Sequence, residues 1–115
     1  MGRYEIRLSG AGGQGMILAG IILAEAVLDE ENLNVTQTQS YGPESRGGAS
    51  RAEVVISEDV IDYPKVIQPD CLLCLTQEAF NKYGSDLKDD GVMIVDERID
   101  ISEAEDDIKD NILSL

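Results

Sequence analysis

The sequence predicts one α/β domain with three layers and a mixed, mostly parallel sheet. A strand-like segment at residues 4–9 leads through a glycine-rich turn into an apolar helix at 16–28. Two short, wholly apolar runs, 71–75 and 92–95, are typical of strands buried on both faces of a sheet. At 115 residues the chain is long enough for one hydrophobic core but not for two. Together these observations favour a Rossmann-like fold that opens on a glycine-rich strand-turn-helix, with residues 1–115 as a single domain.

The first half of the chain predicts a strand, a helix and a second strand. The helix at 16–28 is apolar on most of its surface, as expected of a helix packed in the middle of a domain. Polar residues at 29–32 form a turn, and the alternation of apolar and polar side chains at 33–39 predicts the second strand. We expect the crossover between the two strands to be right-handed.

An irregular segment at 40–50 separates the second strand from a third at 51–57. No helix fits between these strands, so an antiparallel pairing is easier to form than a parallel crossover. The sheet is therefore expected to be mixed. Residues 60–69 are ambiguous, because Pro64 and Pro69 argue against a long helix.

The second half predicts a central strand at 71–75, a brief helix at 77–83 that ends at Gly84, and a last strand at 92–95. From residue 96 onward the chain has eight acidic and two basic residues among twenty, with isoleucines and leucines between them. A helix whose partner surface is missing is one interpretation of this tail.

The composition narrows the classes of partner. The net charge is −14, from 9 basic and 23 acidic residues, which argues against a nucleic-acid or anionic-membrane partner. The charge is uneven: residues 1–51 hold 6 acids and 4 bases, so the first half suits an anionic ligand better. The longest apolar stretch is too short to span a membrane, and no secretory signal opens the chain. We expect a soluble, cytoplasmic protein.

Residues 10–15 read Gly-Ala-Gly-Gly-Gln-Gly, and Gly10, Gly12 and Gly15 fit the pattern G-x-G-x-x-G. In this pattern the glycines permit a tight turn, the close approach of a phosphate, and close packing of helix on strand. Backbone N–H groups and the helix dipole then favour an anionic ligand. The same glycines would also suit a turn that only folds the helix back on the sheet.

The segment 41–51 holds two of the nine basic residues among glycines and serines. A long loop without structure of its own in a compact domain is more often functional than accidental. Arg46 could supply the fork that recognises a phosphate or carboxylate. The alternative is an ordinary loop in which Arg46 pairs with Glu44 or another surface acid.

Cys71 and Cys74 form a single C-x-x-C, and the chain has no histidine. A structural zinc site needs four ligands, and residues three apart on a strand point to opposite faces. We therefore interpret both cysteines as inert, expect no metal site, and assign no catalytic residue to this chain.

The glycine-rich run at 10–15, followed by Gln-Ser-Tyr-Gly-Pro-Glu-Ser-Arg-Gly-Gly at 39–48, resembles the gamma subunit of the 2-oxoacid:ferredoxin oxidoreductases. Stretches at 61–70 and 75–79 are similar to later parts of the same family. The likeness extends from about residue 5 to 97. In form the motifs are closest to the 2-oxoglutarate type, while pyruvate, branched-chain 2-oxoacid and indolepyruvate enzymes carry similar domains.

The resemblance implies a heteromeric enzyme that converts a 2-oxoacid, coenzyme A and oxidised ferredoxin into acyl-CoA, carbon dioxide and reduced ferredoxin. The implied partners are alpha, beta and ferredoxin-like (delta) subunits, which would hold the thiamine diphosphate, the magnesium and the iron–sulfur clusters. This chain would contribute to assembly and to the binding of coenzyme A. The implied cofactor-binding residues are Gly10, Gly12, Gly13, Gln14, Gly15, Tyr41, Ser45, Arg46, Gly47 and Gly48.

Members of this family usually continue beyond the last predicted strand, so a C-terminally shortened domain is an expectation. Its consequence would be a partly exposed apolar face that favours a homodimer or docking to another subunit. Two other functions remain open: a free-standing enzyme that binds NAD or FAD, and a purely structural module for subunit contact. The first is disfavoured because Glu30 and Glu31 precede the second strand, whereas a ribose-binding acid follows it.

Overall fold

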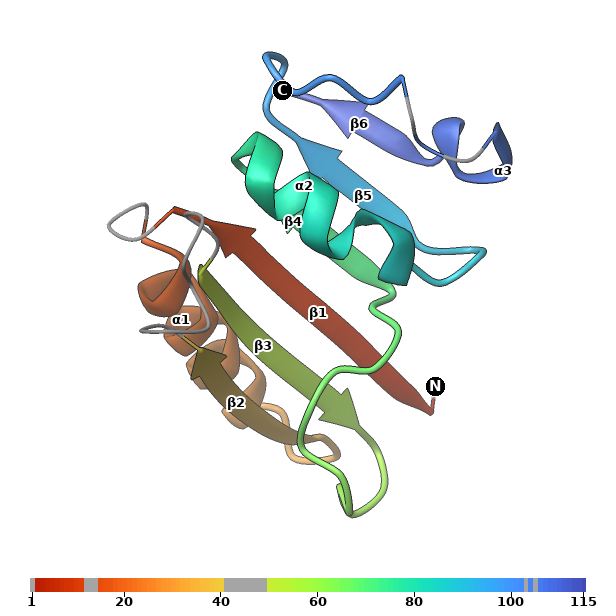
Figure 1. Ribbon diagram of the computed structural model, residues 1–115. Helices are drawn as coiled ribbons and strands as arrows, with labels where there is room; N and C mark the ends of the chain where they lie inside the picture. The colour runs from red at the N-terminus through yellow and green to blue at the C-terminus, as the bar shows by residue number, and fades with distance from the viewer. Residues whose placement is uncertain (1, 12–14, 41–49, 103, 105) are drawn as a thin grey trace.

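The computed structural model describes residues 2–11, 15–40, 50–102, 104 and 106–115, and it confirms the α/β class (Figure 1). The strands within these ranges form one sheet in the order β2-β3-β1-β4-β5-β6. They are β1 (Arg3–Gly10), β2 (Asn34–Ser40), β3 (Ser50–Ser57), β4 (Cys71–Cys74), β5 (Val92–Val95) and β6 (Ile112–Ser114). The helices are α1 (Met16–Leu28), α2 (Gln77–Tyr83), the 3₁₀ helix η2 (Gly84–Asp86) and α3 (Asp106–Lys109). In the view of Figure 1, α1 lies behind the sheet and α2 in front of it.

The sheet is mixed, as expected from the sequence. β1 pairs with β4, β4 with β5, and β5 with β6 in parallel, whereas β3 pairs antiparallel with both β1 and β2. β1 and β2, which α1 joins, therefore run in the same direction but are separated by β3. The antiparallel pairing predicted for the second and third strands is confirmed.

Two glycines position α1 on the sheet. Gly15 precedes the helix with φ of 83°, a left-handed conformation that favours glycine. Gly20 is buried, and a Cβ built there would lie 3.0 Å from the Cβ of Ala52 on β3. The absence of a side chain at position 20 therefore lets the helix axis approach the strand closely.

The α2 side of the sheet carries the larger hydrophobic core. Leu72, Cys74, Met93 and Val95 are fully buried there, beneath Phe80 and its neighbours on α2. The Thr76 hydroxyl caps α2 by accepting a hydrogen bond from the Ala79 N–H at 3.1 Å. α2 ends at Tyr83 as predicted, but Gly84 keeps right-handed angles and the chain continues into η2.

The acidic tail differs from the sequence-based expectation. It forms the short helix α3 and the sixth strand β6, which pairs with β5, so the strand at 92–95 is not the last one. Ile108 is buried in the core on the α2 side, with Ile101 and Ile112 packed against it. The interpretation of the tail as a helix without a partner surface is therefore wrong, because the edge of β5 offers a ladder that the local pattern does not reveal.

Residues 58–70, here called the strap, cross the α2 side of β3 and β1 without regular secondary structure. Within this segment Val66 and Pro69 are buried. Across the described part of the chain, no helix combines the length and the apolar character needed to cross a membrane.

Candidate functional site

The two glycine-rich segments are attached at the same edge of the sheet. β1 ends at Gly10, which lies opposite Ser50 in the ladder, and Ser40 at the end of β2 lies opposite Arg51. The Ser50 hydroxyl also donates a hydrogen bond to the Gly10 carbonyl at 3.2 Å. The segment that follows β1 and the segment between β2 and β3 therefore both attach to the same edge of the sheet, at the carboxyl end of β1.

Of the residues implied as cofactor-binding, two are described at this edge. Gly10 is buried at the end of β1, and Gly15 is exposed at the start of α1, where its carbonyl accepts a hydrogen bond from Ala19 at 2.9 Å. Position 15 is a glycine, so no side chain caps the first turn of α1 from there. The other candidates lie outside the described residues: Gly12, Gly13, Gln14, Tyr41, Ser45, Arg46, Gly47 and Gly48.

A hollow lies at the same edge of the sheet, beyond the ends of β4 and β5. Its volume is about 270 Å³, and Thr76, Gln77, Asp96 and Arg98 are among its lining residues. The Gln77 side-chain amide bonds both backbone groups of Asp100, which fixes the loop after β5 against the start of α2. Ligands of open α/β sheets bind outside the carboxyl ends of the parallel strands, so this hollow extends the candidate site.

Asp96 and Arg98 form a two-point ion pair beside this hollow. The Arg98 Nε and Nη2 atoms donate to the two carboxylate oxygens of Asp96, each at 3.0 Å. The side-chain hydrogen bonds from Arg98 lower the pKa of Asp96 to about 2. The Arg98 side chain is 83% exposed, so water weakens the attraction between the two charges. Asp96 and Arg98 already bind each other through two hydrogen bonds.

A buried ionic network lies next to the candidate site, on the α2 side of β1 and β3. The Arg7 guanidinium donates to Glu53 at 2.8 Å, to Asp86 at 2.7 Å, and to the Val66 carbonyl at 3.1 Å. Arg7 and Glu53 side chains are only 5% and 4% exposed. Glu53 also accepts the Val66 N–H at 3.2 Å, so the pair joins the sheet, the strap and η2.

Tyr83 connects this network to the edge. The Arg7 guanidinium carbon lies 5.0 Å from the centre of the Tyr83 ring, and that of Arg51 lies 5.6 Å from it. Arg51 is 3.6 Å from the Glu53 carboxylate and 28% exposed. Arg51 thus keeps part of its guanidinium in solvent, one residue from the Gly10–Ser50 pair.

The sequence interpretation missed this network, although a signal was present. Arg3, Glu5, Arg7 and Ser9 alternate with apolar residues along β1, which places four polar side chains on one face of a central strand. A run of this kind within a buried strand predicts paired charges, because unpaired charges are rarely buried.

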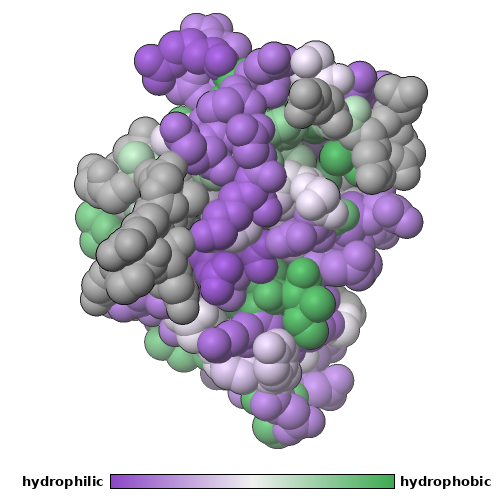
Figure 2. Space-filling view, viewed as in Figure 1, coloured by the Kyte–Doolittle hydropathy of each residue, from purple (hydrophilic) through white to green (hydrophobic). Residues whose placement is uncertain are grey.

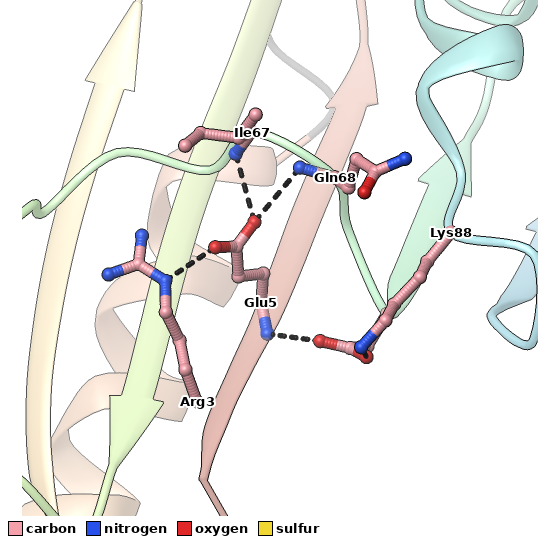
Figure 3. A pocket seen from close by; sticks show the side chains of 6 residues that line it. Arg3, Glu5, Ile67, Gln68 and Lys88 are labelled. Atoms are coloured by element: carbon pink, nitrogen blue, oxygen red, sulfur yellow. Dashed lines mark hydrogen bonds and ion pairs between the residues drawn. The ribbon is translucent and has the colours of Figure 1, made fainter.

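The opposite end of the sheet holds a larger hollow of about 340 Å³ (Figure 3). Its charges are already paired: Glu5 accepts hydrogen bonds from Arg3 and from the N–H groups of Ile67 and Gln68. Lys88 lies 3.4 Å from Asp70, whose other oxygen accepts the Glu5 N–H. These contacts tie the strap to β1.

The two cysteines lie on opposite faces of β4, as predicted from their spacing. Cys74 belongs to the core on the α2 side, and burial raises the pKa of its thiol to about 11. Cys71 pairs in register with Ile6 and is half-buried, and burial also raises its pKa. Among the described residues no group of three cysteine or carboxylate side chains is arranged to hold a metal ion.

The fold and its edge define an α/β domain of Rossmann-like type, in which two glycine-rich segments attach at the carboxyl end of the first strand. The family model for pyruvate ferredoxin/flavodoxin oxidoreductase matches residues 5–112. The chain therefore belongs to this family, as the resemblance implied.

A similar protein supports the family assignment. The 2-oxoglutarate synthase subunit KorC of Methanocaldococcus jannaschii is 62% identical over 95 residues, which are 83% of this chain and 51% of the relative. The chain thus spans about half the length of this relative.

Two solved structures share the fold. The keto/oxoacid ferredoxin oxidoreductase gamma subunit of Geobacter sulfurreducens is 49% identical with a TM-score of 0.77, and the match covers 99% of this chain and 59% of that one. The 2-oxoglutarate:ferredoxin oxidoreductase of Magnetococcus marinus, solved with 2-oxoglutarate, coenzyme A and succinyl-CoA, has a TM-score of 0.71 at 19% identity. That match covers 99% of this chain and 19% of that one, and it shows the fold alone.

Proposed function

We propose that this chain is the gamma subunit of a cytoplasmic 2-oxoacid:ferredoxin oxidoreductase that uses 2-oxoglutarate. The complex would oxidise 2-oxoglutarate with coenzyme A to succinyl-CoA and carbon dioxide, and pass the electrons to ferredoxin. Support comes from the family match over residues 5–112 and from the 62% identity to a 2-oxoglutarate synthase subunit. Thiamine diphosphate, magnesium and the iron–sulfur clusters are assigned to the alpha, beta and ferredoxin-like (delta) subunits.

The contribution of this chain is to bind the anionic part of coenzyme A and to help assemble the complex. The observation that carries the proposal is the register Gly10–Ser50, which attaches both glycine-rich segments at one edge. Backbone N–H groups at the start of α1 would receive a phosphate group, as they do at other glycine-rich turns.

In this proposal each implied residue has a role toward the phosphates. Gly12, Gly13 and Gly15 supply backbone N–H donors, and Gln14 supplies its side-chain amide. The remaining members act from the facing segment, with Arg46 as the cation; they are Tyr41, Ser45, Arg46, Gly47 and Gly48. Gly10 ends β1 and sets the point from which the turn begins.

The first experiment purifies the chain anaerobically from its own cells with its partners. Recovery of thiamine-diphosphate and iron–sulfur proteins, with dye reduction that requires both 2-oxoglutarate and coenzyme A, is the expected result. Replacing 2-oxoglutarate by pyruvate or a branched-chain 2-oxoacid should lower the rate, and a higher rate with either would reassign the substrate. A chain that is recovered alone and binds NADH saturably would instead support the dinucleotide-binding alternative.

The second experiment tests the residues in the assembled enzyme. Arg46→Ala should raise the KM for coenzyme A by about 10-fold to 100-fold, the loss expected for one charge-assisted hydrogen bond of about 1.5–3 kcal/mol. Gln14→Ala should raise it less, and kcat should change little in both. Lys65→Ala removes an exposed cation near the other end of β1, where the Lys65 carbonyl contacts Arg3, and should leave the KM unchanged. An unchanged KM in Arg46→Ala and Gln14→Ala would favour a purely structural role for both segments.

A further inference from the structure

The two faces of the parallel part of the sheet are covered unequally. On the α2 side, Leu72, Met93 and Val95 are fully buried. Their neighbours along the same strands point to the α1 side, where Val92 is 39% and Leu113 56% exposed. We call the part of this surface beyond α1 the open face; its residues are Tyr4, Cys71, Val92, Ile94 and Leu113. Ile6 and Leu73 point to the same side but pack against the core beneath α1.

The open face continues onto α1. This helix packs on β1, β2 and β3, and its core cluster reaches Leu73 of β4, so the α1 side that stays uncovered within the described residues is that of β5 and β6. Its outer surface carries Leu18 at 61% and Ile22 at 56% exposed. By contrast, the α2 side seen in Figure 2 is mostly hydrophilic, with apolar groups in small, separate areas.

The apolar character of the open face and its parallel strands indicate which kind of segment covers it. Parallel sheets are covered by helices on both faces, and here β1, β4, β5 and β6 are parallel. The open face is apolar apart from a tyrosine hydroxyl and a thiol, so it suits an apolar helix stripe and not a strand, which needs backbone partners. A net charge of −14 opposes the approach of a second copy of this chain.

We propose that the open face binds an α-helix from the part of a gamma subunit that lies outside the matched region. The Methanocaldococcus relative matches this chain over only 51% of its length, and the Geobacter subunit over 59%. Such subunits therefore carry further polypeptide of comparable length, enough to supply a helix beside α1. This inference rests on the family and on the sheet, and it holds whether or not coenzyme A binds at the glycine-rich edge.

Cys71 provides a native reporter of the open face. Its thiol is half-buried on that face, while Cys74 is buried on the other and serves as an internal control. The experiment compares this chain with a chimera in which the unmatched part of the Methanocaldococcus relative is joined to it in the relative's own order. Alkylation of each cysteine is followed by mass spectrometry at a mildly alkaline pH. The rate at Cys71 should fall by about tenfold or more in the chimera, with slow labelling of Cys74 in both proteins.

A matched pair of variants separates docking from general stability. Leu113→Glu places a charge on the open face at a site that is 56% exposed, and it should restore labelling of Cys71 in the chimera. Ile67→Glu places the same charge on the strap, on the α2 side, at a site that is 64% exposed, and it should not. Equal labelling of Cys71 in the chimera and in this chain overturns the proposal.

Other occupants give different results, each of which would also overturn it. Labelling of Cys71 that slows as the concentration of this chain rises would assign the open face to a second copy. Protection of Cys71 that requires the purified alpha, beta or delta subunits would assign the face to them. Where rapid labelling of Cys74 shows that the chimera is unfolded, the unmatched part is added to the folded chain as a separate peptide. Loss of Cys71 labelling is then expected, and its absence refutes the inference.

Discussion

Replacing Glu53 by glutamine tests the buried network most directly. The substitution keeps the size of the side chain, so it creates no cavity, but it removes the negative charge that faces Arg7 at 2.8 Å. The new amide can still accept the Val66 N–H, while its NH₂ group would meet the Arg7 Nε–H, which is also a donor. Arg7 would then depend on Asp86 and on the Val66 carbonyl.

The expected cost follows from the burial of the pair. Removing one partner of a buried ion pair costs about 3–5 kcal/mol, because the other charge is left without compensation. Asp86 is 42% exposed and continues to pair with Arg7, which places the expectation for Glu53→Gln near the lower end, at about 3 kcal/mol. A domain of this size has about 5–15 kcal/mol of total stability, so the loss would be large.

The assay is equilibrium unfolding in urea, with the free energy extrapolated to water. Asp96→Asn is the matched control, since it makes the same kind of change in a pair with 3.0 Å contacts whose arginine is 83% exposed. That variant should change stability little. If Glu53→Gln costs no more than Asp96→Asn, the network does not contribute through the burial of its charges, and the reasoning fails.

Two further predictions follow from single contacts. The Asp96 carboxyl should titrate near its folded pKa of about 2 by NMR, and Arg98→Ala should raise the midpoint toward the ordinary 3.8. Because the folded pKa is depressed, any stability from this pair is present above pH 3.8 and is lost as the pH falls toward 2; a midpoint at 3.8 in the unaltered protein would contradict this. Gly20→Val should destabilise by about 1–3 kcal/mol in urea unfolding, because even a Cβ there lies 3.0 Å from Ala52. Ala26→Val at an exposed site of α1 should cost only about 0.5 kcal/mol, and equal losses would show that the contact with β3 is not tight.

Local patterns predicted the elements that depend on local chemistry. The alternation at 33–39 and the apolar runs at 71–75 and 92–95 lie where β2, β4 and β5 form. The edge of the sheet to which the first glycine-rich segment attaches was also predictable, because that segment directly follows β1 in the chain. Structural roles for most residues of the two segments stay predictions, since only Gly10 and Gly15 are described there.

Features that depend on distant partners were not predictable from the same patterns. β6 forms because β5 offers an edge and because the core on the α2 side accepts Ile108 and Ile112. Neither fact can be read from the tail sequence, whose acidic residues with isoleucines and leucines between them were interpreted as a helix whose partner surface is missing. Similarly, the pairing of Arg7 with Glu53 joins residues 46 positions apart, so the sequence shows two charges in strands but not that they meet.

The buried pair also bears on the candidate site through the register of the sheet. Arg7 lies opposite Glu53, and three residues further along the same two strands Gly10 lies opposite Ser50. A slip of one residue would turn a charged side chain from the α2 side toward the apolar packing of α1, because side chains alternate between faces. Such a shift would bury a charge without its partner, at a cost of several kcal/mol. The ion pair therefore specifies the alignment that starts both glycine-rich segments from one point, which gives buried charges in β1 and β3 a role in placing the site as well as in stability.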